Sequence, residues 1–92
     1  MSYTLIVPPS FRRQAKKFLK AHPDLRETVG IVLRALEDDP FQPQLHLHPL
    51  GGNLAGCHAV SVTYSYRITL ILQLTEHEII LLDIGSHDDV YR

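Results

Sequence analysis

The sequence predicts an α+β domain in which a helical hairpin packs on a mostly antiparallel, four-stranded sheet, in the order β-α-α-β-β-β. Two short runs of β-branched and aliphatic residues near the C-terminus, 66–74 and 79–84, are separated by the polar turn 75–78 and predict a central β-hairpin. Two amphipathic segments precede them, and a short apolar run opens the chain. Helices that cover one face of such a sheet make a two-layer fold.

The first 40 residues predict one strand followed by two helices. Residues 3–7 (YTLIV) read as a short strand that two prolines end, and Ser10 is the expected N-cap of the first helix. This helix carries an apolar stripe at helical spacing and ends before Pro23. The second helix is expected from Asp24 to the acidic stretch before Pro40. Because only a few residues join the helices, we expect them to pack as an antiparallel hairpin.

The middle of the chain predicts a loop and then the rest of the sheet. Residues 41–50 read as a loop or an irregular extended segment and residues 54–64 as a strand. From Tyr66 onward, alternate residues are apolar and should pack under the helices. Arg67 belongs to the opposite face, which we expect to be polar and open enough to hold a ligand. The other residues expected on that face are Ser61, Thr63 and Thr69.

Length and composition predict one globular domain over residues 1–92. The chain is 45% apolar and 21% charged, as in ordinary soluble proteins. It has no apolar run of membrane-spanning length and no secretory signal at its start. Its single cysteine, Cys57, excludes an internal disulfide and a multi-cysteine zinc site. We therefore expect a cytoplasmic protein with no membrane partner.

Charge is divided unevenly along the chain. Residues 1–34 hold seven basic and two acidic residues, a net charge of +5, whereas residues 35–92 hold two basic and eight acidic residues, a net charge of −6. The basic face of the first helix could meet a polyanion or could simply be solvated surface. Its members are Arg12, Arg13, Lys16, Lys17 and Lys20.

Four features of the sequence occur together: the order of elements, HPLGGNLAGC at 48–57, YRI at 66–68 and LLDIGSHDDVY at 81–91. In this combination the whole chain resembles the RelE/ParE toxin superfamily of bacterial toxin–antitoxin modules, and within it the RelE, YoeB and YafQ-like mRNA interferases. The resemblance implies a type II toxin that cleaves mRNA, typically in the ribosomal A site, without a metal or other cofactor. It also implies a small antitoxin protein as partner.

By position, the resemblance assigns four catalytic residues. Arg67 matches the active-site arginine after the tyrosine of Y-R-I, and His87 matches the C-terminal catalytic histidine of the YoeB and YafQ branches. Tyr91 matches the aromatic position near the C-terminus, and His48 matches the active-site histidine that the YafQ branch has before its turn.

The resemblance also suggests where RNA is bound. Ser61 and Ser65 stand where the YafQ branch has a further histidine and an aspartate, and the middle segment has histidines and glycines where RelE has lysines. The expected RNA-binding residues are therefore these two serines and the basic residues of the first helix.

The implied chemistry suits these residue types. Attack by the 2′-hydroxyl on the adjacent phosphate needs a base, an acid for the leaving 5′-oxygen and positive charge at the phosphorane. Imidazole serves as either base or acid, and guanidinium donors fit phosphate oxygens. We expect His87 as acid and His48 as base, in roles that could be exchanged, with Arg67 as the phosphate clamp and Tyr91 as stacker or assisting donor.

Structural roles remain open for the same residues. Arg67 could pair with an acid such as Asp83, and His87 could cap the last turn of the chain. His46 and His48 alternate as H-x-H and could form a metal pair on one strand face, although no third ligand is evident nearby.

Three functions stay compatible with the sequence. The first is the metal-independent endoribonuclease. The second is a ParE-like inhibitor of DNA gyrase, which binds a protein and catalyses nothing. The third is a weakened or unpaired family member that mainly binds a partner. An antitoxin gene beside this one would support the first two.

Overall fold

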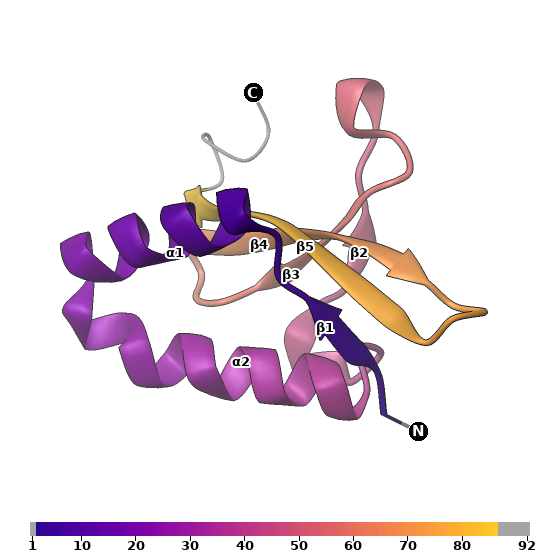
Figure 1. The fold of residues 1–92 in the computed structure, drawn as a ribbon, viewed down its shortest axis with the longest axis horizontal. Coiled ribbons are helices and arrows are strands. Elements are labelled where there is room, and N and C mark those ends of the chain that lie inside the picture. The colour runs from indigo at the N-terminus through magenta and orange to yellow at the C-terminus, as the bar shows by residue number, and fades with distance from the viewer. Residues whose placement is uncertain (1, 87–92) are drawn as a thin grey trace.

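The computed structural model describes residues 2–86 and confirms the α+β class: two helices cover a five-stranded mixed sheet (Figure 1). The strand order is β1-β5-β4-β3-β2. Two of the predicted catalytic residues, His87 and Tyr91, lie outside the described residues.

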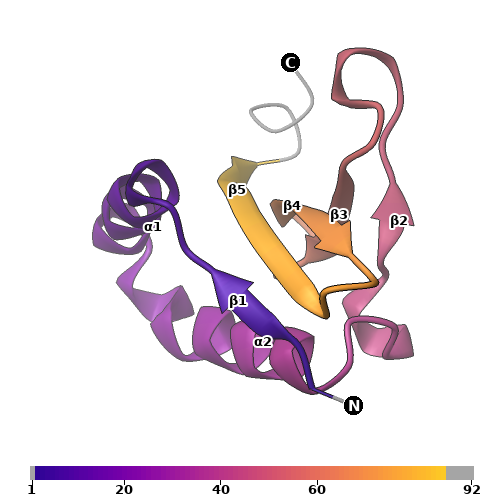
Figure 2. The ribbon, with the colours of Figure 1, turned by 45° about the vertical axis from the view of Figure 1, so that its right-hand side comes forward.

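The centre of the sheet is the hairpin that the two apolar runs predict. It consists of β4 (Tyr66–Gln73) and β5 (Glu78–Ser86). β1 (Thr4–Ile6) pairs with β5 in parallel, and this pair makes the sheet mixed. On the other side, β3 (His58–Ser61) and β2 (His48–Pro49) extend the sheet by antiparallel pairing (Figure 2).

Two predictions about the sheet are wrong. It has five strands instead of four, because a two-residue strand, β2, forms inside the segment expected to be a loop. The strand expected at 54–64 begins only at His58, because the 3₁₀ turn η3 (Gly52–Leu54) precedes it and Gly56, at a φ of 93°, interrupts the extended backbone.

The helix starts also differ from prediction. Ser10 lies inside α1 (Pro9–Ala21) instead of capping it, because Pro8 is the N-cap. Proline suits the first helical position, where its missing N–H has no partner to lose and its φ is already helical. α2 (Arg26–Asp38) begins two residues later than expected, because Pro23–Leu25 forms the 3₁₀ turn η1.

The two helices run antiparallel but make their main contacts with the sheet instead of with each other (Figure 1). α1 packs against β5, and α2 packs against β1 and the 3₁₀ turn η2 (Pro43–Leu45). The backbone N–H of Tyr3 also donates to the Glu37 carbonyl at 2.6 Å. This bond satisfies one of the carbonyls that a helix end leaves unpaired. Helix-on-sheet packing thus replaces the helix-on-helix packing expected of a hairpin.

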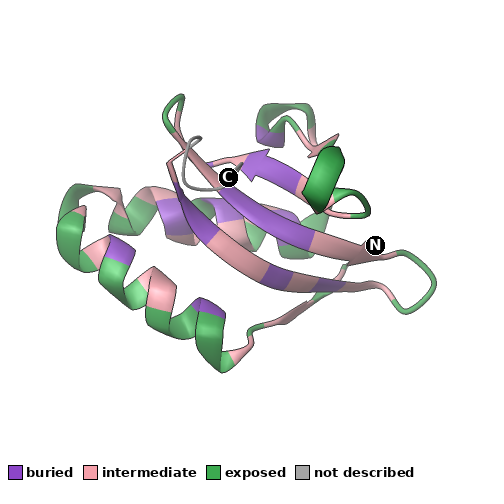
Figure 3. Cartoon of the chain, turned by 90° about the horizontal axis from the view of Figure 1, so that it is seen from above, coloured by how far each residue is buried: buried purple, intermediate pink, exposed green. Residues whose placement is uncertain are grey.

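One hydrophobic core lies between the helices and the sheet, where the buried stretches of both layers meet (Figure 3). The helical stripes contribute through positions spaced three, four or seven residues apart, as an amphipathic helix requires. The core residues of the helices are Phe11, Phe18, Val29, Val32 and Leu36, and those of the central strands are Val60, Ile68, Leu70, Ile79, Leu81 and Ile84.

Within residues 2–86, no helix combines the length and the apolar character that crossing a bilayer requires.

Truncating a core side chain should destabilise the domain far more than truncating an exposed one. Leu36 is fully buried, whereas Leu74 is 56% exposed. We expect Leu36→Ala to lower the free energy of unfolding by roughly 2–5 kcal/mol, through lost burial and a residual cavity. The same change at Leu74 should cost under about 1 kcal/mol. Urea unfolding followed by circular dichroism measures both, and equal losses would contradict this account of the core.

Candidate functional site

Alternation along the central strands divides the sheet into two faces. Val60, Ile68 and Ile84 lie opposite one another in the register and are buried in the core. Their neighbours along each strand therefore point to the other side of the sheet, away from the helices. We call this side the outer face, and its residues are His48, Ala59, Ser61, Arg67, Thr69, Asp83 and Gly85.

Two rows of paired residues cross the outer face. The first runs through His48, Ala59, Thr69 and Asp83, and the second through Ser61, Arg67 and Gly85. His48 and Arg67 are two strands and one row apart, a backbone separation of roughly 12 Å from standard strand spacings. The strand between them, β3, contributes only the short side chains of Ala59 and Ser61. No large side chain of β3 therefore stands between His48 and Arg67 on this face.

The centre of the outer face is less open than predicted. Thr69 was expected on an open polar surface, but it is only 3% exposed and Ala59 is fully buried. His48, Ser61 and Arg67 are half-buried. The accessible part of this face therefore lies at His48 on β2 and at Ser61 and Arg67 near the β3–β4 turn.

A β-bulge decides which residues of β5 reach the outer face. Leu70 pairs with Leu81, but Thr69 pairs with Asp83, so Leu82 is left between them without a partner on β4. An extra residue of this kind inverts the alternation beyond it. Asp83 and Gly85 consequently join the outer face. The sequence does carry a signal for this bulge, because strict alternation from Ile79 and Leu81 would put Asp83 in the core, whereas the apolar residue is Ile84.

His48 is oriented by its own segment of the chain. Its Nδ1 lies 2.8 Å from the backbone oxygen of His46. A carbonyl oxygen only accepts hydrogen bonds, so the neutral His48 ring must carry its proton on Nδ1. His46 has a left-handed backbone with a φ of 52° at the end of η2. This contact with the His46 oxygen fixes the orientation of the His48 ring and the nitrogen that carries the proton of its neutral form.

The possible metal pair of His46 and His48 gains no third ligand in the described part of the chain. Within residues 2–86, no group of three or more His, Cys, Asp or Glu side chains is arranged to hold a metal ion. The contact between the two histidines is instead the hydrogen bond from the ring of one to the backbone of the other.

Arg67 is oriented by the turn that precedes it. Its Nη1 donates to the backbone oxygens of Thr63 and Tyr64, at 3.0 Å each, and of Tyr66 at 3.3 Å. Its Nε is buried and has no hydrogen-bond partner among residues 2–86. The hydrogen bonds of Arg67 within this range go to carbonyls and not to Asp83, so the alternative of an Arg67–Asp83 pair gains no support. The guanidinium is thus held in place while keeping donor capacity for an anion.

The other predicted RNA-binding residues lie in two separate regions. Ser61 is on the outer face beside Arg67, and Ser65 is exposed in the β3–β4 turn. The five basic residues of α1 are exposed on the helix that packs against β5, and they do not join the outer face. Lys17 comes nearest to it, because it lines a hollow of about 410 Å³ together with Tyr66 and Gly85.

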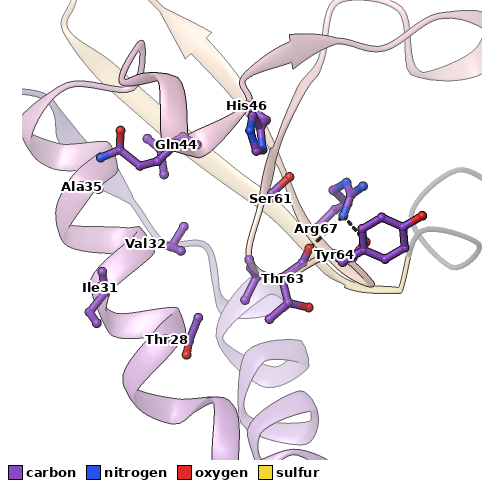
Figure 4. A pocket seen from close by; sticks show the side chains of 12 residues that line it. Thr28, Ile31, Val32, Ala35, Gln44, His46, Ser61, Thr63, Tyr64 and Arg67 are labelled. Atoms are coloured by element: carbon purple, nitrogen blue, oxygen red, sulfur yellow. Dashed lines mark hydrogen bonds between the residues drawn. The ribbon is translucent and has the colours of Figure 1, made fainter.

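A larger pocket adjoins Arg67 and was not predicted from the sequence. It has a volume of about 520 Å³ and lies between α2, η2 and the β3–β4 turn (Figure 4). Arg67 and Ser61 line it from the sheet, and His46 lines it from η2. Tyr64 also lines it and is 96% exposed. Exposure of an aromatic ring depends on the final fold, so sequence periodicity carried no sign of this pocket.

Comparison with known proteins places the chain among bacterial toxins. The family model described as the bacterial toxin of type II toxin–antitoxin system, YafQ, matches residues 3–92. The crystal structure of YafQ from E. coli strain BL21(DE3) is similar with a TM-score of 0.81 at 15% sequence identity, covering 98% of this chain and 99% of that one.

Two solved complexes show the same fold. The E. coli DinJ–YafQ toxin–antitoxin complex matches with a TM-score of 0.79 and 16% identity, over 100% of both chains. The RelBE2 toxin–antitoxin complex from Mycobacterium tuberculosis matches with a TM-score of 0.66 and 19% identity, over 95% of this chain and 100% of that one. No curated protein matches the sequence.

The His48 hydrogen bond gives a test of the site geometry that does not depend on function. At a pH where the ring is neutral, we expect His48 to carry its proton on Nδ1, because only that tautomer donates to the His46 carbonyl. Long-range ¹H–¹⁵N NMR correlation of the imidazole distinguishes the tautomers. Residence of the proton on Nε2 would rule out the orientation described here, because Nδ1 would then be an acceptor and could not donate to the His46 carbonyl.

Proposed function

Because this chain belongs to the YafQ family of toxins of bacterial type II toxin–antitoxin systems, we propose that it is an endoribonuclease that cleaves mRNA without a metal ion. A ribose 2′-hydroxyl attacks the adjacent phosphorus, and the bond from phosphorus to the 5′-oxygen breaks. The 2′-hydroxyl proton goes to a base and the leaving oxygen takes a proton from an acid. The products end in a 2′,3′-cyclic phosphate and a 5′-hydroxyl.

The observation that carries this proposal is the presence of His48 and Arg67 on one face of the sheet with only Ala59 and Ser61 between them. A base and a phosphate clamp must reach the same phosphodiester, since one acts on the 2′-oxygen and the other on the non-bridging oxygens of the neighbouring phosphate. Side chains on opposite faces could not do so. Their shared face supports a common substrate.

Each group suits its proposed role through its local hydrogen bonds. His48 donates from Nδ1 to the His46 carbonyl, so Nε2 is the nitrogen that takes the 2′-hydroxyl proton. The hydrogen bonds of Arg67 within residues 2–86 all come from Nη1, so Nη2 is the proposed donor to a phosphate oxygen. A fixed donor stabilises developing charge without first having to reorganise.

The remaining roles rest on the sequence resemblance. His87 is proposed as the acid that protonates the leaving 5′-oxygen, and Tyr91 as a stacking or assisting residue. Both lie outside the described residues. Gly85, two residues before His87, stands on the outer face next to Arg67.

The basic face of α1 is proposed to bind RNA phosphates away from the cleavage site, with the ribosome as the expected source of that RNA. Its residues are exposed and carry no acidic neighbour on the helix. Such contacts supply affinity that falls with salt and do not depend on base sequence. Ser61 and Ser65 are proposed to contact RNA nearer to Arg67.

A cognate antitoxin protein is the proposed regulator. The DinJ–YafQ and RelBE2 structures are toxin–antitoxin complexes whose toxin chains share this fold. We propose that the partner of this chain is likewise a small protein.

Removing the side chain of His48 or of Arg67 should abolish most cleavage. We expect His48→Ala to reduce the cleavage rate by roughly 10²–10⁴-fold and Arg67→Ala by roughly 10²–10³-fold. Arg67→Lys should recover only part of the loss, because an ammonium lacks the fixed fork of donors. Primer extension on mRNA translated in a reconstituted system measures the rate at each cleavage site.

Matched controls use the same residue types elsewhere in the fold. Arg26 is exposed at the start of α2, and His77 lies in the β4–β5 turn with a φ of 55°, which asparagine tolerates. Arg26→Ala and His77→Asn should cleave like the parent. Parent-like cleavage by His48→Ala and Arg67→Ala would show that the outer face is not catalytic.

The chemistry of the products gives an independent test. Cleavage should proceed unchanged in EDTA and should leave a 2′,3′-cyclic phosphate, because the attacking oxygen comes from the RNA. RNA with a 2′-O-methyl group at the cleaved nucleotide should stay intact. Mass spectrometry of the fragments identifies the ends, and a 5′-phosphate product would exclude this mechanism.

A further inference from the structure

The pocket beside Arg67 has no role in the reaction described above. One wall comes from α2, where Ile31 is 52% exposed and Val32 is buried. The opposite wall comes from the end of β3 and the β3–β4 turn, where Val62 and Tyr64 contribute. The walls are thus mainly apolar, while Arg67 closes one side with a positive charge (Figure 4).

Tyr64 is unusual for an aromatic residue because 96% of its surface meets solvent. Burying an aromatic ring is one of the largest gains a side chain offers a fold, so this exposure leaves that gain unused. The backbone at Tyr64 is nevertheless held in place, because its carbonyl accepts a hydrogen bond from Arg67 at 3.0 Å. The same arginine therefore holds the backbone of Tyr64 at the edge of the pocket and lines the proposed phosphate site.

We propose that this pocket binds one nucleobase of the RNA substrate, in the nucleotide next to the cleaved phosphate, with Tyr64 as its stacking surface. This inference rests on the proposed function, which puts a phosphate at Arg67. A base is connected to its phosphate through a single sugar, so a phosphate at Arg67 brings a base to the adjoining hollow. Single-stranded RNA is commonly bound through bases stacked on aromatic side chains.

The chemistry of the pocket fits a base better than an apolar protein side chain. A volume of about 520 Å³ lies within the range of small-ligand pockets. A base has two apolar faces and a polar edge, and the pocket offers apolar walls from Ile31 and Val32 with polar groups from Gln44 and His46 at η2. The neighbouring guanidinium favours an anionic ligand, which a nucleotide is and an aliphatic side chain is not.

The test measures binding separately from cleavage. The probe is a fluorescein-labelled hexaribonucleotide with 2′-O-methyl groups, which lacks the attacking hydroxyl. Fluorescence anisotropy with the full chain gives the dissociation constant. We expect Tyr64→Ala to weaken binding roughly 5- to 100-fold, the loss typical of one stacked base. Ile31→Glu should weaken it at least as much, because it puts a carboxylate on the pocket wall.

Two controls match these changes in type and exposure. Phe41→Ala removes another exposed aromatic ring, 54% exposed, and Leu74→Glu adds a carboxylate at a residue 56% exposed. Leu74 follows β4 at the end opposite Arg67, roughly 23 Å away along the strand. Both controls should change the dissociation constant less than about twofold.

A series of abasic probes identifies the bound nucleotide. Removing the base at one position of the probe should weaken binding to the parent protein as much as the Tyr64→Ala substitution does. The same abasic probe should bind the Tyr64→Ala variant no more weakly than the complete probe does. Equal binding by Tyr64→Ala and Phe41→Ala would overturn the proposal. Intact RNA binding by Tyr64→Ala together with a weakened antitoxin complex would also overturn it and make the pocket a protein-docking site.

The outcomes separate this inference from the ribonuclease proposal. If the parent protein does not cleave RNA, yet binds it through Tyr64 at one base position, the base-pocket proposal stands and the ribonuclease proposal is wrong. If the Tyr64→Ala variant cleaves RNA at the same sites and binds it with the same affinity as the parent, the ribonuclease proposal stands and the base-pocket proposal is wrong.

Discussion

The structure depends on the register of β4, which pairs with β5 over its whole length and with β3 from Arg67 to Leu70. Side chains alternate between faces with a period of two, so a shift of one residue would exchange the core with the outer face. Ile68 and Arg67 are neighbours in β4, so their side chains must point to opposite faces of the sheet. Burial of Ile68 under the helices therefore places Arg67 on the outer face. Core packing against both helices is therefore what keeps Arg67 on the side of His48. The stability of the domain and the geometry of its site are set by the same alternation.

The side chains of His48 and Arg67 are held by contacts that do not involve the core. The His48 ring is bonded to a carbonyl two residues away, and the Arg67 guanidinium is bonded to carbonyls within four residues of it. The sheet therefore determines on which face each of the two side chains lies, whereas local hydrogen bonds determine how each side chain is oriented there. A change in the β3–β4 turn can disturb Arg67 without unfolding the domain, because the bonds come from the turn.

Much of the fold could be predicted from the sequence, and the parts that could not have a common physical cause. The β4–β5 hairpin and the face of Arg67 follow from alternation within one long strand, which the sequence displays. β2 has only two residues, too few for any pattern, and it exists because a neighbouring strand pairs with it. The position of His48 on the outer face therefore could not be derived from spacing. The exposure of Tyr64 likewise depends on how a turn sits against α2, which is a tertiary property.

The parallel pairing of β1 with β5 joins the first described strand to the last one. Contacts between distant parts of a chain are slow to form because a long loop must close first. During synthesis, β1 emerges from the ribosome long before the strand that will flank it. The Tyr3 bond to the end of α2 can form earlier, but the sheet stays incomplete until β5 is free. The nascent protein therefore cannot assemble its finished sheet, or the outer face built on it, before β5 has left the ribosome.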